Sequence, residues 1–223
     1  MEQFLAFPLE QLPFVFLVLM IAFTVHEFAH AYSAYKFGDP TAYRLGRVSL
    51  NPRVHLDVLG TILILIAGFG WAKPVPVNRS MFRRPRLMGV VVSAVGPLSN
   101  LLIAFIGVFL WHALDTFGVL NAMSLGVYRA TRLFFELLIM LNIVLFLFNL
   151  IPLPPLDGYR IVEDLVPNDV RARLSRLEPY GAFVFLLIVF LPPLRDRTIV
   201  PLFALTNDLF NGMSRVALIL LGQ

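Results

Sequence analysis

The chain has 223 residues, of which 58% are hydrophobic and only 14% are charged, and its mean hydropathy is +0.80. A soluble domain of this length would carry nearly twice that share of charged residues, since about a quarter of typical residues are Asp, Glu, Lys or Arg. Cys is absent, which excludes disulfides, zinc-thiolate sites, iron-sulfur clusters and thiol nucleophiles. The composition therefore predicts a single membrane-embedded domain over residues 1–223, without a separate soluble core.

The net charge is +4, but the basic residues are spread between apolar runs rather than gathered on one surface. This distribution is typical of residues that set membrane topology beside anionic lipid, and it argues against nucleic acid as a partner. We therefore expect the chain to lie in a lipid bilayer.

Five apolar runs predict helices that cross or enter the membrane. The first run has no Lys or Arg before it, unlike a signal peptide, so we expect it to remain as a helix. The runs extend from Leu12 to about Tyr35, from Leu87 to about Leu114, from Leu133 to Ile151, from Tyr180 to Leu194 and from Ile199 to Leu221. The fourth is short for a full crossing. The predicted fold class is an all-α polytopic membrane protein with about five transmembrane helices.

Between the first two runs, the stretch from Val58 to Trp71 is apolar but interrupted by glycines. It is shorter than the roughly 17 residues that a crossing needs, so we predict a re-entrant or short extended segment. With this segment returning to its starting side, thirteen Lys or Arg residues face one side of the membrane and four face the other. The positive-inside tendency then places the N-terminus outside and the C-terminus in the cytoplasm.

The first run contains residues 26–30, which read H-E-F-A-H. On a helix His26 and His30 lie four residues apart on one face, so both imidazoles can bind one zinc ion while Glu27 acts as general base. A carboxylate in a membrane helix is costly unless it faces protein, water or a metal. The pattern therefore predicts a zinc site in the first helix.

A catalytic zinc ion usually has three protein ligands, so a further donor is needed. Asp157 is a candidate because it follows three prolines that break the helix after Asn149, and such a break is tolerated at membrane depth only beside protein or a polar cavity. Asp157 could instead cap a helix or a turn. His55 either lines the site or structures its loop, and His112 beside Trp111 is typical of an interfacial residue.

Residues 26–30 together with residues 149–158, which read N-x-x-P-x-P-x-x-D-G, resemble the site-2 proteases, a family of intramembrane zinc metallopeptidases. Residues 96–100, Gly-Pro-Leu-Ser-Asn, are similar to a small-residue motif of the same family. Residues 70–78 resemble the corresponding segment of compact members, which lack PDZ and CBS domains. The resemblance covers most of the chain up to about Arg160.

The resemblance implies that His26, His30 and Asp157 bind one Zn2+ ion per chain. It also implies that Glu27 activates water and that Asn149 holds the substrate or its oxyanion. The protein would then be a multi-pass protein of a prokaryotic plasma membrane, with its active site toward the cytoplasmic half.

These features predict a zinc endopeptidase that hydrolyses a peptide bond in or near a transmembrane segment of a membrane protein substrate. One alternative is a zinc transporter or metal-storing membrane protein, which would need ionisable residues at successive depths. Another is a catalytically idle scaffold that binds membrane helices. An intact Glu27 favours the enzyme over the scaffold.

The segment from Trp71 to Asn78 is a candidate substrate-binding strand. Its prolines disfavour helix, and an extended edge can accept an added strand through main-chain hydrogen bonds. We expect Val75, Val77 and Asn78 to line a substrate cleft beside Asn149. The alternative is a rigid loop that shapes the mouth of the active site.

Overall fold

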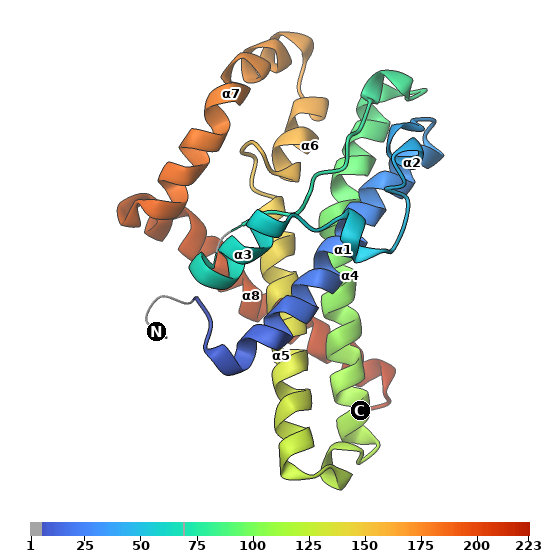
Figure 1. The fold of residues 1–223 in the computed structure, drawn as a ribbon, viewed down its shortest axis with the longest axis vertical. Helices are drawn as coiled ribbons and strands as arrows, with labels where there is room; N and C mark the ends of the chain where they lie inside the picture. The colour runs from blue at the N-terminus through green and yellow to red at the C-terminus, as the bar shows by residue number, and fades with distance from the viewer. Residues whose placement is uncertain (1–5, 69) are drawn as a thin grey trace.

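The protein is described by a computed structural model that covers residues 6–68 and 70–223, and all the regular elements in these ranges are helical (Figure 1). The long helices are α1 (Leu12–Lys36), α4 (Pro85–Thr116), α5 (Leu125–Asn149), α7 (Asn168–Phe190) and α8 (Pro192–Leu220). The short helices are α2 (Thr41–Arg44), α3 (Val58–Ala67) and α6 (Asp157–Leu165), and the 3-10 turns are η2 (Leu9–Gln11), η3 (Pro52–Val54), η4 (Arg79–Met81) and η5 (Leu120–Ala122).

Three helical segments of the described chain are long and apolar enough to cross a membrane: Leu9–Lys36, which ends with α1, and the helices α4 and α5. Helices α7 and α8 meet this criterion only as a pair, and they are bent by 88° at the break between them. The prediction of an all-α membrane protein is confirmed. The described residues offer three crossings, or four when the bent pair forms one broken span, so the predicted number of five is not confirmed.

Helix α3 has ten residues, fewer than the roughly 17 that a crossing needs. It begins at Asp57, whose side chain accepts a hydrogen bond from Gly60 N, and it ends at Gly68 with positive φ. The chain then passes back across α3, and a Cβ on Gly60 would lie 2.1 Å from the Trp71 carbonyl oxygen. Gly60 and Gly70 thus allow a tight backbone crossing, which agrees with a segment that does not span.

The apolar runs predicted α1 and α4 to within two residues at each end, but α5 begins eight residues before the predicted Leu133. Its N-terminus is set by Ser124, whose side chain accepts a hydrogen bond from Val127 N. Arg132, at the end of the added turns, pairs at 2.6 Å with Glu136, four residues further along the helix. Hydropathy locates the membrane-embedded part of a helix, whereas capping and helical charge pairs extend it into water.

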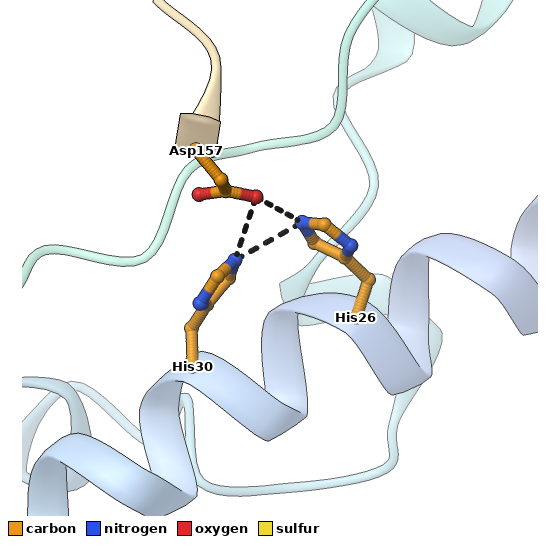
Figure 2. Close-up of side chains that lie close together, drawn as sticks. All are labelled: His26, His30 and Asp157. Carbon is orange, nitrogen blue, oxygen red and sulfur yellow. Dashed lines mark hydrogen bonds and ion pairs between the residues drawn. The ribbon is translucent and has the colours of Figure 1, made fainter. Parts of the chain in front are cut away.

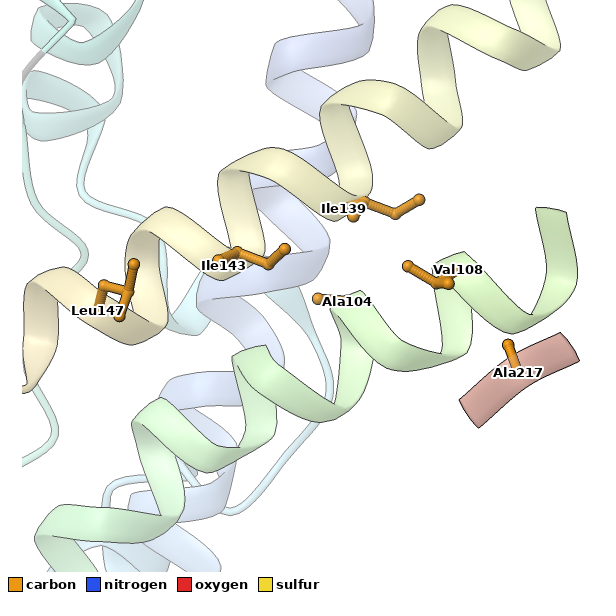
Figure 3. Close-up of a cluster of buried hydrophobic side chains, with 6 residues drawn as sticks. All are labelled: Ala104, Val108, Ile139, Ile143, Leu147 and Ala217. Atoms are coloured by element: carbon orange, nitrogen blue, oxygen red, sulfur yellow. The ribbon is translucent and has the colours of Figure 1, made fainter. Parts of the chain in front are cut away.

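Helix α4 lies at the centre and packs against α1, α5, α6 and α8. Figure 3 shows one buried cluster in which α4 and α5 lie side by side and α8 adds a side chain from below. Its members are Ala104, Val108, Ile139, Ile143, Leu147 and Ala217. Small residues such as Ala104 let membrane helices approach closely. The close packing of α4 against α5 fixes the two helices relative to each other, and with them the side chains on their other faces.

Candidate metal centre

The side chains of the three predicted metal ligands converge (Figure 2). His26 and His30 project from one face of α1, and Asp157 is the first residue of α6. The two Nε2 atoms lie 3.0 Å apart, and Asp157 Oδ2 lies 3.2 Å from His26 Nε2 and 3.3 Å from His30 Nε2. Both histidines are buried. The fold therefore brings together residues that are distant in the sequence.

Hydrogen bonds on the far side of each ring decide which nitrogen faces the centre. His30 Nδ1 donates to the Val92 carbonyl at 2.6 Å, and His26 Nδ1 donates to Asn100 Oδ1 at 2.8 Å. A carbonyl oxygen can only accept, so in both neutral rings the hydrogen is assigned to Nδ1. Each Nε2 therefore presents a lone pair toward Asp157.

The centre thus holds three electron-pair donors with no hydrogen between them, and Asp157 Oδ2 is buried without a hydrogen-bond donor in the described chain. Such atoms repel one another unless a cation lies among them. A tetrahedral zinc ion with bonds of about 2.0–2.2 Å separates its ligand atoms by about 3.3–3.6 Å, somewhat above the distances found here. The residues fit zinc, and they form the one group of this kind among the residues that the structure describes.

Helix α4 supplies no ligand but makes room for both rings. A Cβ on Gly96 would lie 2.2 Å from His30 Nε2 and 2.8 Å from His26 Cε1, so the backbone of α4 lies directly against the imidazoles. Pro97 lacks an N–H and interrupts the helical ladder there. Residues 96–100 therefore shape the metal centre in two ways. Gly96 leaves room for the imidazoles, and Asn100 accepts a hydrogen bond from His26.

Glu27 lies beside this group and is buried. Its Oε2 accepts a hydrogen bond from Val75 N at 2.9 Å, which joins the irregular segment 70–78 to the predicted general base. Arg47 holds the same segment by donating to the carbonyls of Lys73 and Pro74, at 2.6 and 3.2 Å. The segment is therefore fixed over the site rather than loosely attached.

His55 also holds segment 70–78, and with Arg47 it forms what we call the clamp on that segment. Its carbonyl accepts a hydrogen bond from Lys73 N at 2.8 Å. Its imidazole is fully buried and donates from Nε2 to the Ser49 carbonyl at 2.7 Å. Burial of this ring lowers the His55 pKa. These contacts support the loop-structuring role for His55 over a role in lining the site.

A cavity of about 890 Å³ adjoins the centre, and the three predicted ligands and Glu27 line it. Val75, Val77 and Asn149 also line it, as predicted, and the Asn149 side chain donates to the carbonyl of Leu145 in its own helix. Asn78 is not among the described residues that line this cavity, and its role in a substrate cleft stays a prediction. Its side chain caps η4 by accepting from Ser80 N, because a short polar side chain satisfies the free N–H groups at the start of a turn.

Ion pairs hold α6, the helix that begins with Asp157. Arg79 lies 2.9 Å from Asp164 and 3.3 Å from Glu163, and Arg171 lies 3.5 Å from Asp164. Burial raises the pKa of Asp164. Burial alone would raise the pKa of Glu163, but the guanidinium groups of Arg160, 3.1 Å away, and Arg79 together lower it. These ion pairs fix the position of α6 along α4, and they therefore fix the position of Asp157, the first residue of α6.

The sequence has relatives among zinc metalloproteases. The family model described as Peptidase family M50 matches residues 126–192. A Bacillus subtilis (strain 168) protein named "Putative zinc metalloprotease YwhC" is 54% identical over 210 residues, which cover 93% of the chain and 94% of that protein. The chain belongs to peptidase family M50. Two more distant relatives are each named "Putative zinc metalloprotease Rip2". The one from Mycobacterium tuberculosis (strain ATCC 25618 / H37Rv) is 28% identical over 78% of the chain and 65% of its own length. The one from Mycolicibacterium smegmatis (strain ATCC 700084 / mc(2)155) is 25% identical over 78% of the chain and 66% of its own length.

As an M50 member the protein is a zinc metalloprotease with zinc as its cofactor, and the predicted resemblance to the site-2 proteases is confirmed. No solved structure gives a significant match to the chain.

Sequence reasoning missed the residues that support the M50 site. Asn142 on α5, which is fully buried, and Arg47, which is nearly so, are the main examples. The signal for Asn142 was its amide in the apolar part of α5, where an amide is costly without a partner. For Arg47 the surrounding loop sequence carries no such signal.

Proposed function

We propose that this M50 protein is an intramembrane endopeptidase that hydrolyses a peptide bond in or near a transmembrane segment of a membrane protein substrate. The observation that carries the proposal is that His26 and His30, on a helix of membrane-spanning length, converge with Asp157 of α6 beside Glu27. One part of the adjoining cavity is lined by apolar side chains from α1, α5 and α8, including Phe23, Phe148 and Phe203, and charged side chains such as Arg79 and Arg171 line another part. Apolar walls beside a hydrolytic centre suit an apolar segment of substrate.

In this proposal His26, His30 and Asp157 hold the zinc ion. When bound, zinc supplies Lewis-acid chemistry, activating water and polarising the scissile carbonyl. Glu27 accepts the proton of the attacking water and later passes it to the leaving amine. Asn149, on the cavity wall, donates a hydrogen bond to the substrate backbone or to the developing oxyanion.

A helical substrate must unwind to expose its peptide bond. The segment that carries Val75 and Val77 is irregular. Val75 N donates to Glu27, while within the described residues Val77 N and the Val75 carbonyl have no main-chain partner. We assign these groups to pairing with the unwound substrate.

The alternative of a zinc transporter receives less support. A transport route needs ionisable residues at successive depths. The described residues contain one group of three potential metal ligands, and it lies next to a carboxylate placed as a general base.

The active site is proposed to open toward the cytoplasm of a prokaryotic cell. The positive-inside tendency is one support. A second is that Arg79, before α4, and Arg171, on α7, contact the same carboxylate of Asp164, as expected for two loops on one side of the membrane.

The test compares the native membrane proteome of cells with the wild-type protein and cells with Glu27→Gln. Membrane proteins that accumulate uncut only in the variant are the expected substrates, and the purified variant should keep its zinc because Glu27 is not a ligand. The matched control is Glu136→Gln, the same chemical change at an exposed position on α5. Equal cleavage by wild type and Glu27→Gln would refute the assignment of the general base.

A further inference from the structure

Three buried amide and imidazole groups form a chain that starts at the metal centre and ends inside α5. His26 Nδ1 meets Asn100 Oδ1 at 2.8 Å, and Asn100 Nδ2 donates to Asn142 Oδ1 at 2.9 Å. Asn142 Nδ2 then donates to the Leu138 carbonyl at 2.8 Å. Asn100 and Asn142 are both fully buried, so water does not replace these partners.

The far end of this chain sets its direction. The Leu138 carbonyl can only accept, so Asn142 must turn its NH2 group toward Leu138 and its oxygen toward Asn100. Asn100 must then present its own NH2 group to Asn142 and its oxygen to His26. His26 in turn must carry its hydrogen on Nδ1, which leaves Nε2 as the lone-pair atom facing the metal centre.

We infer that Asn142 is a positioning residue of the metal centre, which acts through Asn100 to hold the His26 ring in its metal-binding tautomer and orientation. The inference rests on the proposed role of His26 as a ligand. Partners on the far nitrogen of a ligating histidine raise metal affinity, and their loss typically weakens binding by about 10–100-fold. Asn142 does not itself line the cavity, and its side chain bonds Asn100 and the Leu138 carbonyl rather than a metal ligand, so its effect must pass through Asn100.

Asn100 has a second, longer contact that limits the expected effect. Its Nδ2 lies 3.4 Å from the Ala22 carbonyl, which also favours the same amide orientation. Removal of Asn142 alone should therefore weaken zinc binding by about 10-fold, the lower end of the range, and removal of Asn100 by more.

The experiment measures the zinc dissociation constant of the purified full-length protein by competition with a chromophoric chelator. The variants are Asn142→Leu, Asn100→Leu and the double variant, with Leu chosen because it is close to Asn in size. If the amides act in series, the double variant binds zinc no more weakly than Asn100→Leu alone. Asn142→Ser replaces Asn142→Leu if the latter does not fold, as judged by helicity.

Ile143→Ala is the matched control, because Ile143 is the next residue of α5, is fully buried and has no polar group. It should lower the thermal midpoint and leave zinc affinity unchanged. The inference is overturned if Asn142→Leu binds zinc as wild type does, if the two single effects multiply in the double variant, or if Ile143→Ala weakens zinc equally. Unchanged affinity in His26→Ala would overturn the ligand assignment and this inference with it, whereas failure of the proposed proteolysis would appear in the Glu27→Gln test.

Discussion

Substitution of Gly96 by Ala adds one methyl group at the point where α4 touches the metal centre. The new Cβ would lie 2.2 Å from His30 Nε2 and 2.4 Å from His30 Cε1, whereas ordinary contacts begin at 3.4 Å. The His30 ring must therefore retreat by about 1.2 Å, and metal sites tolerate displacements of only about 0.2 Å in their ligand distances. Loss of a ligand should weaken zinc binding by more than the roughly 100-fold seen for a lost outer partner.

The same substitution should leave the protein folded. Ala favours a helix interior by about 1 kcal/mol over Gly, and the clash falls on the ends of two side chains rather than on another backbone. Elemental analysis of the purified variant should find little zinc, while circular dichroism finds wild-type helicity. Gly212→Ala on α8 is the control, because a Cβ there meets nothing within 4 Å. Stoichiometric zinc and normal cleavage in Gly96→Ala would refute the packing of α4 against the imidazoles.

Three further predictions concern the ligands, the clamp and the topology. His26→Ala, His30→Ala and Asp157→Ala should each lose most zinc by elemental analysis, and full retention by Asp157→Ala would remove that residue from the ligand set. Arg47→Met should keep its zinc but cleave about 10-fold more slowly or worse in steady-state assays, because two charge-assisted hydrogen bonds to segment 70–78 are lost. An unchanged rate would show that the clamp is dispensable. Single cysteines at Arg83 and Arg171 should both resist a membrane-impermeant thiol reagent until lysis, and labelling of one from outside would contradict their common side.

The sequence predicted α1, which carries His26 and His30, because it has a strong local signal, but it did not predict α6 as a helix. The apolar run around His26 is long, and the four-residue spacing to His30 needs only helical periodicity to become a shared face. The prediction of Asp157 as the third ligand followed from the helix-breaking prolines and from family resemblance.

The supporting contacts were less accessible because they join residues far apart in the chain. The side chain of Asn78 could serve a cleft or cap a turn, and only the packed structure shows the cap. The bend between α7 and α8 likewise depends on tertiary packing, so two apolar runs were counted as two crossings. The sequence does not reveal the close contact at Gly96, because a glycine alone does not show which side chain occupies the place where a Cβ would lie.

The assembly of the metal centre from α1 and α6 has a consequence for biosynthesis. A chain is made from its N-terminus, so His26 and His30 enter the membrane well before Asp157, which follows only after α4 and α5. Until α6 has docked, the nascent chain has two imidazoles without their carboxylate partner. The three predicted ligands are therefore complete only late in synthesis, once α6 has been made and has docked on α4.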